Sequence, residues 1–222
     1  MDLSVIRYDR RMPTKLTHRD ILLVVDVQND FLPGGALAVP DGDAVVPAAN
    51  ALASRFAHVV LTQDWHVPGH LSFASSHPGK VPFDTILLPY GPQVLWPDRC
   101  VQGTRGAEFA PGLSIPQAEL IVRKGYRREI DSYSAFCEVD HVTRTGLAGY
   151  LRERGFSRIY LAGLATDFCV AWSALDARSA GFEVVVIEDA CRAIDTAGSL
   201  AAAWSGMREA GVERISSQAL VA

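Results

Sequence analysis

Ile21-Leu-Leu-Val-Val25, a run of five apolar residues followed directly by Asp26, indicates most clearly how this chain folds. The run is too short for an ordinary helix, is rich in β-branched residues and lacks the alternation of a half-exposed strand. It therefore predicts a strand that is buried on both faces of a parallel sheet. Five more runs of this kind follow along the chain: His58–Thr62, Leu120–Val122, Arg158–Leu161, Phe182–Ile187 and, more weakly, Val212–Ser216.

Segments of helical length lie between these runs. An Asp or Thr side chain can cap the free N–H groups of a first turn, and glycine suits the left-handed position after a last turn. On this basis we expect helices from Asp43 to about Phe56, from Thr143 to Gly155, from Thr166 or Asp167 to Gly181, and from Thr196 to Gly211. The alternation predicts an α/β fold, a doubly wound, mainly parallel six-stranded sheet with helices on both faces.

The composition is that of a globular protein with one sizeable core. The chain has 222 residues, of which 49% are hydrophobic and 21% are charged. We expect an N-terminal extension over residues 1–20 and a single domain over residues 21–222. Two stretches rich in Gly and Pro, Val27–Gly42 and Trp65–Ala118, are far longer than ordinary connections. Loops of that size in a compact domain usually carry function.

Charge and cysteine usage narrow the class of protein. The net charge of −4 disfavours a general nucleic-acid binder. No apolar run reaches the roughly 18 residues of a membrane-spanning helix, and the basic N-terminus lacks the apolar segment of a secretory signal. The four cysteines are widely spaced, which argues against a disulfide framework and for a reducing compartment. We therefore expect a cytoplasmic protein that contacts neither membrane nor nucleic acid.

Four reactive side chains fall at the ends of predicted strands. Asp26 ends the first strand, Asp64 lies just past the second, Lys124 ends the third, and Cys169 lies in the first turn of the helix after the fourth. In an open α/β sheet the ligand crevice lies at the carboxyl ends of the strands. The four side chains are therefore expected to converge on one edge of the sheet.

Each of these residues also has a structural interpretation. Cys169 at a helix N-terminus is expected to have a lowered thiol pKa and neighbouring N–H groups that can hold an oxyanion, but taken alone it equally fits a buried structural cysteine, like Cys100, Cys137 and Cys191. Asp26 can be a helix-capping or solvated loop residue, and Lys124 a lysine on the sheet rim. A buried Asp–Lys pair, however, keeps both groups charged and can exchange protons with a thiol.

The segment Asp64-Trp-His66-Val-Pro-Gly-His70 places one carboxylate and two imidazoles within seven positions. Asp-x-His in a turn is suited to half of a Zn²⁺ or Fe²⁺ site. A cluster of hydrogen-bonded histidines explains the same spacing, and the residues alone leave both alternatives open.

Taken together, the motifs resemble those of nicotinamidases (pyrazinamidases) in the isochorismatase-like cysteine hydrolase superfamily. The likeness runs from about Ile21 to Ser216. It rests on Val25-Asp26-Val-Gln-Asn-Asp30-Phe31, Asp64-Trp-His66, Trp96-Pro-Asp-Arg-Cys-Val-Gln-Gly103-Thr, Lys124-Gly and Gly163-Leu-Ala-Thr-Asp-Phe-Cys169-Val, in that order.

The resemblance implies a role for each matching residue. It makes Asp26, Lys124 and Cys169 the catalytic triad and implies a cis peptide bond before Ala165, with the amides of Ala165 and Cys169 as an oxyanion hole. It makes Phe31 and Trp96 the aromatic walls around the substrate ring. It also makes Asp64 and His66 ligands of a divalent metal, Zn²⁺, Fe²⁺ or Mn²⁺.

One position departs from the family pattern. Relatives carry His in the segment Trp-Pro-x-His-Cys-Val as a third protein ligand, and this chain has Arg99 there. A guanidinium stays protonated and offers no lone pair, so it cannot coordinate a metal. We therefore expect metal binding to be weakened, rearranged or absent, with His70 as the best local substitute ligand.

The resemblance predicts an amidohydrolase that deamidates nicotinamide and pyrazinamide-like amides to the acid and ammonia through a cysteine thioester. One alternative is a metal-independent cysteine amidase of the same superfamily, acting on N-carbamoyl or maleamate-like substrates. Another is a non-catalytic binding or redox-sensing domain. The partner is expected to be a small-molecule amide. The Ala- and Arg-rich segment Ala174–Ala180 leaves open whether the chain also forms a homo-oligomer.

Overall fold

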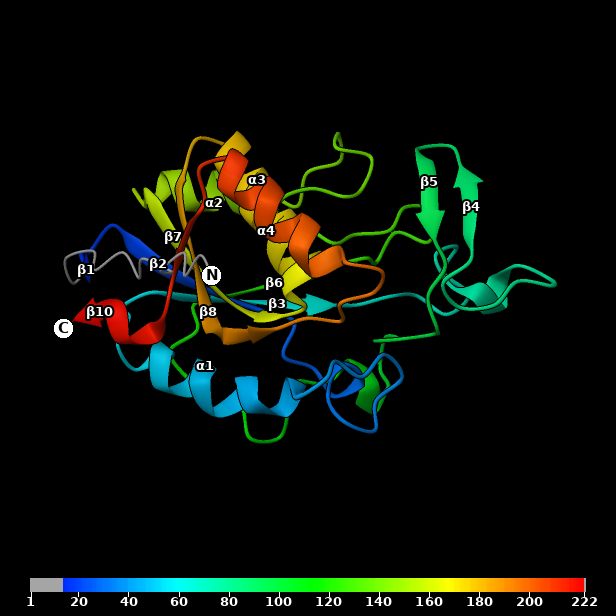
Figure 1. The fold of residues 1–222 in the computed structure, drawn as a ribbon, viewed down its shortest axis with the longest axis horizontal. Coiled ribbons are helices and arrows are strands. Elements are labelled where there is room, and N and C mark those ends of the chain that lie inside the picture. Colours follow the sequence, from blue (N-terminus) through cyan, green and yellow to red (C-terminus); the bar gives the residue numbers. More distant parts are fainter. Residues whose placement is uncertain (1–13, 222) are drawn as a thin grey trace, which may run out of the picture.

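The computed structural model describes residues 14–221, and its centre is a six-stranded sheet in which all neighbouring strands are parallel (Figure 1). All six predicted strands are present, and every residue of the first two is buried, as their continuous apolar runs predicted. In chain order they are β2 (Asp20–Val25), β3 (Val59–Asp64), β6 (Leu120–Lys124), β7 (Arg158–Leu164), β8 (Glu183–Arg192) and β9 (Glu213–Ile215).

The strand order is β6-β3-β2-β7-β8-β9, which places the reversal of winding between β2 and β7. From β2 the chain moves outward through β3 to β6, then returns to β7 on the other side of β2 and continues outward to β8 and β9. At such a reversal the connections on the two sides diverge and leave a crevice at the carboxyl ends of the strands, where open α/β sheets bind ligands. The segments that follow Val25 and Leu164 begin at this crevice.

The backbones of β2 and β7 approach closely at the reversal. Gly163 pairs with Val25 and has a φ of 128°, a conformation that L side chains rarely adopt. A Cβ atom at this position would lie only 2.1 Å from the Val25 carbonyl oxygen. Glycine is therefore required where the two strands open into the crevice.

Helices cover both faces of the sheet, as predicted. Helix α1 (Val45–Ala53) lies on one face, and α2 (Leu147–Glu153), α3 (Ala171–Ser179) and α4 (Ser199–Glu209) lie on the other (Figure 1). Right-handed crossovers explain this division, because the chain winds toward one edge of the sheet before β6 and toward the other edge after it.

The predicted helix starts are wrong in detail, while the glycine stops are confirmed. Asp43 lies inside a short 3₁₀ turn before α1 and makes no capping bond. Helix α2 begins four residues after Thr143, and the Thr145 hydroxyl accepts the Leu147 N–H at 3.2 Å. Helix α4 begins at Ser199 rather than at Thr196. The stops Gly155, Gly181 and Gly211 all have positive φ, as left-handed positions after a last turn require.

The third predicted helix opens with a turn of π-helix over Thr166–Val170, which continues directly into α3. Asp167 does not cap it. Its carboxylate instead accepts the N–H groups of Ile194 and Asp195 and the Ser199 hydroxyl, all just before or at the start of α4. A tertiary contact between two helix starts thus replaces the local cap that the sequence suggested.

The long stretch Trp65–Ala118 contains a hairpin that the sequence analysis missed. Strands β4 (Thr85–Leu88) and β5 (Gly91–Val94) pair in antiparallel fashion beyond the carboxyl ends of the central strands (Figure 1). β4 contains the apolar run Ile86–Leu88, but the hairpin is poorly covered and Leu87 is 80% exposed.

The predicted extension over residues 1–20 is only partly described, because residues 1–13 lie outside the described part of the chain. Of the rest, β1 (Thr14–Lys15) pairs with β10 (Leu220–Val221), and Asp20 already belongs to β2 and binds the Arg158 guanidinium. The first strand of the central sheet therefore starts one residue before the apolar run Ile21–Val25. Across residues 14–221, none of the helices combines the length and apolar character needed to cross a membrane.

Candidate active site

Asp26 is the first residue after β2 and is fully buried. Its φ of 48° lies in the left-handed region, which Asp adopts more readily than most residues. Oδ1 accepts a hydrogen bond from the Thr62 hydroxyl at 2.6 Å, and the Asp26 N–H donates to the same hydroxyl oxygen at 3.1 Å. Oδ2 lies 2.7 Å from Lys124 Nζ. The carboxylate is thus held at both oxygens.

Lys124 ends β6 and is likewise fully buried. Its ammonium pairs with Asp26 and with Asp64, and lies 3.5 Å from Cys169 Sγ. Burial lowers the pKa of Lys124, but the carboxylates of Asp26 and Asp64 raise it by more, so the pKa lies well above its ordinary value. The ammonium therefore stays charged and holds three reactive side chains together.

The two carboxylates beside Lys124 have pKa values displaced in opposite directions. Burial and the negative charge of Asp64 raise the pKa of Asp26 against the opposing effect of Lys124. Burial also acts to raise the pKa of Asp64, but Lys124, His66 and Arg99 together lower it below its ordinary value. Such divergence is typical of a carboxylate that exchanges protons beside one that stays ionised.

Cys169 lies in the π-helical turn after β7, and Ala165 precedes that turn. The reactive atoms of Cys169, Asp26 and Asp64 all lie within 4.8 Å of one another. The sequence predicted a thiol pKa lowered by the helix N-terminus, and this expectation is wrong. Burial raises the pKa of Cys169 well above its ordinary value against the opposing effect of Lys124, and the charges of Asp26 and Asp64 raise it further. The resting thiol is therefore protonated and needs a base.

The peptide bond between Leu164 and Ala165 is cis, as the resemblance implied. Ala165 is buried, and it shares with Cys169 the wall of one small pocket. The assignment of the Ala165 and Cys169 amides to an oxyanion hole stays a prediction.

The pocket beside Cys169 brings together residues from the two long loops and from the π-helical turn. Phe31 and Trp96, both expected at the substrate ring, line it together. The rest of the lining is mostly apolar: Leu37, Arg99, Tyr133, Ala165, Phe168, Cys169 and Ile194. Trp96 packs edge-on against Phe168 with ring centroids 5.0 Å apart, and its indole N–H donates to the Tyr133 hydroxyl at 2.8 Å. Such a site suits a flat ring.

Sequence reasoning missed three residues of this region: Tyr133, Phe168 and Asp131. Phe168 directly precedes Cys169, the expected nucleophile, and this neighbouring position was a signal in the sequence that could have identified it. Tyr133 and Asp131 lie in an irregular loop after β6, and the sequence carries no periodic signal there. Asp131 is fully buried and accepts a hydrogen bond from the Gln93 side chain at 3.0 Å.

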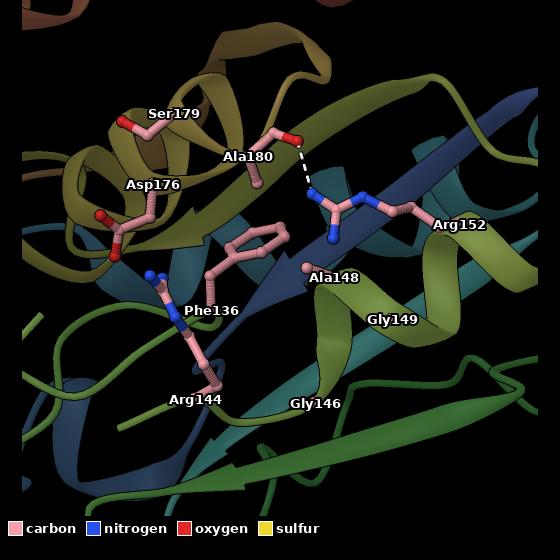
Figure 2. Close-up of a pocket in the computed structure, with 9 residues that line it drawn as sticks. All are labelled: Phe136, Arg144, Gly146, Ala148, Gly149, Arg152, Asp176, Ser179 and Ala180. Carbon is pink, nitrogen blue, oxygen red and sulfur yellow. Dashed lines mark hydrogen bonds between the residues drawn. The ribbon is translucent and has the colours of Figure 1, made fainter. Parts of the chain in front are cut away.

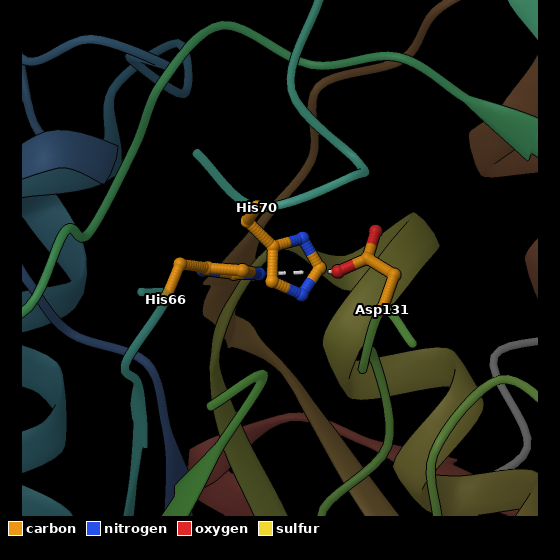
Figure 3. Close-up of side chains that lie close together, drawn as sticks. All are labelled: His66, His70 and Asp131. Carbon is orange, nitrogen blue, oxygen red and sulfur yellow. Dashed lines mark hydrogen bonds and ion pairs between the residues drawn. The ribbon is translucent and has the colours of Figure 1, made fainter. Parts of the chain in front are cut away.

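Three side chains of metal-ligating type lie close together, although none of them lines the pocket beside Cys169. His66, His70 and Asp131 are fully buried, and their candidate ligand atoms lie within 4.8 Å of one another (Figure 3). His66 Nε2 lies 3.1 Å from Asp131 Oδ1, and His66 Nδ1 lies 3.9 Å from Asp64 Oδ2. The region is therefore a candidate metal-binding cluster by residue type and by proximity.

His70, however, already has partners at both ring nitrogens. Nε2 lies 2.7 Å from the Arg127 carbonyl oxygen and must donate its hydrogen there. Nδ1 accepts the Ser72 N–H at 3.1 Å. Burial, together with neighbouring His66, lowers the pKa of His70 to about 4, so the ring is neutral near pH 7. The hydrogen-bonded histidine, the alternative left open by the spacing, describes this side chain as it stands.

Arg99 places its guanidinium between two carboxylates. It is 2% exposed, with Nε 3.6 Å from Asp64 Oδ2 and Nη2 3.6 Å from Asp131 Oδ1. Burial acts to lower the pKa of Arg99, but Asp131 and Asp64 raise it further above its ordinary value. A permanent cation therefore lies beside the candidate ligands Asp64, His66 and Asp131.

A larger pocket, of about 390 Å³, lies at the surface between α2 and α3 (Figure 2). Its walls include Phe136, Arg144 and Asp176, and the Arg152 guanidinium at its rim donates to the Ala180 carbonyl. Neither Cys169 nor its partners line it. We therefore place the chemistry at the smaller pocket, where the reactive groups meet.

The fold and the site define a family. The isochorismatase-domain profile matches residues 20–219, and the chain belongs to that family.

Several proteins to which this chain is similar are nicotinamidases. The nicotinamidase of Acinetobacter baylyi is 61% identical over 197 residues, which cover 89% of this chain and 92% of the relative. The solved structure of the Acinetobacter baumanii nicotinamidase/pyrazinamidase has a TM-score of 0.91 at 60% identity and covers 92% of this chain and 99% of its own. The pyrazinamidase of Pyrococcus horikoshii, solved in complex with zinc, has a TM-score of 0.73 at 35% identity. The match covers 89% of this chain and 99% of that structure's chain.

Proposed function

We propose that this protein is an amidohydrolase that deamidates nicotinamide and pyrazinamide-like amides to the corresponding acid and ammonia. The observation that carries the proposal is the contact of Lys124 with Asp26 and Cys169 beside a pocket lined by Phe31 and Trp96. The 61% identity to a nicotinamidase supports the choice of substrate.

The first half of the reaction forms a thioester. Asp26, whose raised pKa suits a base, accepts the proton of the Cys169 thiol, and the sulfur attacks the carboxamide carbon. Lys124 keeps its proton and stabilises the negative charge that moves between sulfur and carboxylate. Asp26 then gives its proton to the departing nitrogen, and ammonia leaves as the carbon–nitrogen bond breaks.

The second half hydrolyses the thioester. Asp26, again ionised, accepts a proton from water as the water oxygen attacks the thioester carbon. The carbon–sulfur bond breaks, the sulfur recovers a proton from Asp26, and the carboxylic acid is released. In both halves the amides of Ala165 and Cys169 are the proposed donors to the oxyanion.

The residues fit a metal less well than they fit this acid–base chemistry. A relative is known in complex with zinc, and Asp64, His66 and His70 are the ligands we expected from the sequence. Asp64 Oδ2 and His66 Nδ1 are buried without a hydrogen-bond partner among the described residues, as open ligand atoms would be. However, Arg99 Nε lies 3.6 Å from Asp64 Oδ2, and both His70 nitrogens have other partners. We therefore route no step of the mechanism through a metal ion.

One observation favours the runner-up, a metal-independent cysteine amidase acting on N-carbamoyl or maleamate-like substrates. Arg99 lines the pocket and carries a positive charge, which is the chemistry that recognises a substrate carboxylate. Against it, Asp64 and Asp131 already flank this guanidinium with two negative charges.

Ammonia release from nicotinamide, pyrazinamide, an N-carbamoyl amino acid and maleamate, measured with the purified protein, tests the proposal. We expect nicotinamide and pyrazinamide to be the faster substrates. Preference for maleamate or the N-carbamoyl compound would establish the runner-up. No ammonia from any of the four would indicate a non-catalytic binding or redox-sensing domain.

A further inference from the structure

Arg99 has one nitrogen without a partner among the described residues. Nε and Nη2 face Asp64 and Asp131, whereas Nη1 is buried and has no hydrogen-bond acceptor within residues 14–221. A buried N–H group of a cation without an acceptor is costly unless a ligand supplies one. The guanidinium carbon lies 5.3 Å from the centre of the Trp96 ring, and both residues line the pocket that contains Cys169.

The place of Arg99 also conflicts with a bound dication. A metal held by Asp64 and His66 would lie beside Asp64 Oδ2, the oxygen that Arg99 Nε approaches to 3.6 Å. The guanidinium cannot ligate the ion and would repel it across a few ångströms of buried space. The same guanidinium already compensates Asp64 and Asp131, the carboxylates whose charge would otherwise attract a cation.

The chemistry of the pocket limits what Nη1 can bind. The charge of Arg99 is already balanced by two carboxylates, so a third anion gains little there. The remaining lining is mostly aromatic and aliphatic, which favours a neutral ring. When the carboxamide of a heteroaromatic amide lies at Cys169, its remaining neutral acceptor is the ring nitrogen.

We propose that Arg99 takes the place of a metal ion in this chain: it compensates Asp64 and Asp131 and donates from Nη1 to the ring nitrogen of the substrate. Arg99 is then a specificity-determining residue that distinguishes a pyridine ring from a benzene ring. The inference rests on the proposed function for the identity of the ring, but its metal-excluding part does not.

Metal content tests the first part without any assay of turnover. The wild-type protein and Arg99→His are incubated with excess Zn²⁺, freed of unbound ion, and measured by elemental analysis and by thermal unfolding with and without a chelator. We expect the wild type to hold no stoichiometric metal and to unfold at the same temperature with chelator. Arg99→His is expected to hold about one ion per chain, because imidazole is a zinc ligand, and to lose thermal stability in chelator. A wild-type protein with one tightly bound ion per chain overturns this part.

Substrate discrimination tests the second part. The ratio of kcat/KM for nicotinamide to that for benzamide is measured, in chelator, for the wild type and for Arg99→Met. We expect the substitution to lower kcat/KM for nicotinamide by about 10- to 100-fold, the effect of one charge-assisted hydrogen bond, mainly through KM. Benzamide has no ring nitrogen and is expected to change little. An unchanged ratio, or equal losses on both substrates, overturns the proposal.

Two further variants guard against misfolding and nonspecific effects. Arg99→Lys keeps the charge between the carboxylates, but its single nitrogen cannot contact both carboxylates and the ring together, so the ratio is still expected to fall. Arg123→Met is the matched control, because Arg123 also stacks on a tryptophan, Trp65, but is exposed and does not line the pocket.

If the wild type releases no ammonia from nicotinamide, the proposed function fails and the metal measurement still decides the first part. If it does release ammonia and Arg99→Met keeps the ratio, only the present inference fails.

Discussion

The ammonium nitrogen of Lys124 lies 3.5 Å from the sulfur of Cys169, although 45 residues separate them in the chain. The lysine ends β6, an edge strand of the central sheet, and the cysteine follows β7 beyond two intervening strands. Burial and the neighbouring carboxylates raise the thiol pKa against this contact, so the lysine does not by itself produce a thiolate. This geometry supports the proposal that Asp26 is the base and that Lys124 stabilises the charge being moved.

Loss of the nucleophile is expected to abolish turnover. Cys169→Ala removes the sulfur that is proposed to form the thioester, and ammonia release from nicotinamide is expected to fall by at least about 10³-fold. The matched control is Cys191→Ala, which removes another buried thiol, on β8, that does not line the pocket. Substantial ammonia release by Cys169→Ala, with Cys191→Ala also active, would rule out the thioester mechanism.

Thr62→Val is expected to move the acid limb of the pH–rate profile upward. The base must be ionised, so kcat/KM falls as the pH drops through the pKa of Asp26. The hydrogen bond from the Thr62 hydroxyl is one of the contacts that lowers this pKa, and valine removes it without changing the shape of the side chain. We expect the limb to shift by up to about one pH unit toward higher pH. Thr104→Val, which removes a hydroxyl in an exposed loop, serves as the control. A shift toward lower pH would contradict the assignment of Asp26.

Removal of the Lys124 charge is expected to destabilise the fold. Lys124→Met leaves the buried carboxylates of Asp26 and Asp64 without their shared cation, and the free energy of unfolding is expected to fall by about 3–5 kcal/mol. Urea unfolding measures the loss, and Asp26→Asn in the same chain should restore part of it. The exposed pair of Lys80 with Asp84 offers a control, since Lys80→Met is expected to cost less than about 1 kcal/mol. Equal effects of the two lysine substitutions would show that the buried cluster is not coupled.

Two Gly→Ala substitutions are expected to have opposite effects on stability. Gly163→Ala forces a Cβ to within 2.1 Å of the Val25 carbonyl at a positive φ and is expected to cost at least about 1–3 kcal/mol. Gly149→Ala, within α2 and with nothing within 4 Å of the new atom, should stabilise by about 0.5–1 kcal/mol. Thermal or urea unfolding distinguishes them. A neutral Gly163→Ala would show that β2 and β7 can separate at the crevice without loss.

Features that depend on the residues of a single segment could be predicted from the sequence. The six parallel strands were predicted from short apolar runs, which in β2 and β3 are buried on both faces. The glycine stops were predicted because each needs a positive φ. The expected cap of the third helix was wrong because the Asp167 carboxylate binds the start of α4, whereas the start of α2 was misplaced because Thr145, and not Thr143, accepts its first N–H. The β4–β5 hairpin was missed although β4 contains the apolar run Ile86–Leu88, because the run lies within a long Gly- and Pro-rich stretch interpreted as a loop.

The sequence by itself determined the strand–helix alternation and which residues end the strands, because hydrophobic patterning and residue chemistry are properties of each segment alone. It also showed that position 99 carries no metal ligand. Only the tertiary structure decided that Asp26 has a raised pKa, that the Cys169 thiol is protonated, and that the Arg99 guanidinium lies between Asp64 and Asp131. Those properties depend on burial and on distances between charges from different strands, and neither quantity exists until the sheet has brought the strands together.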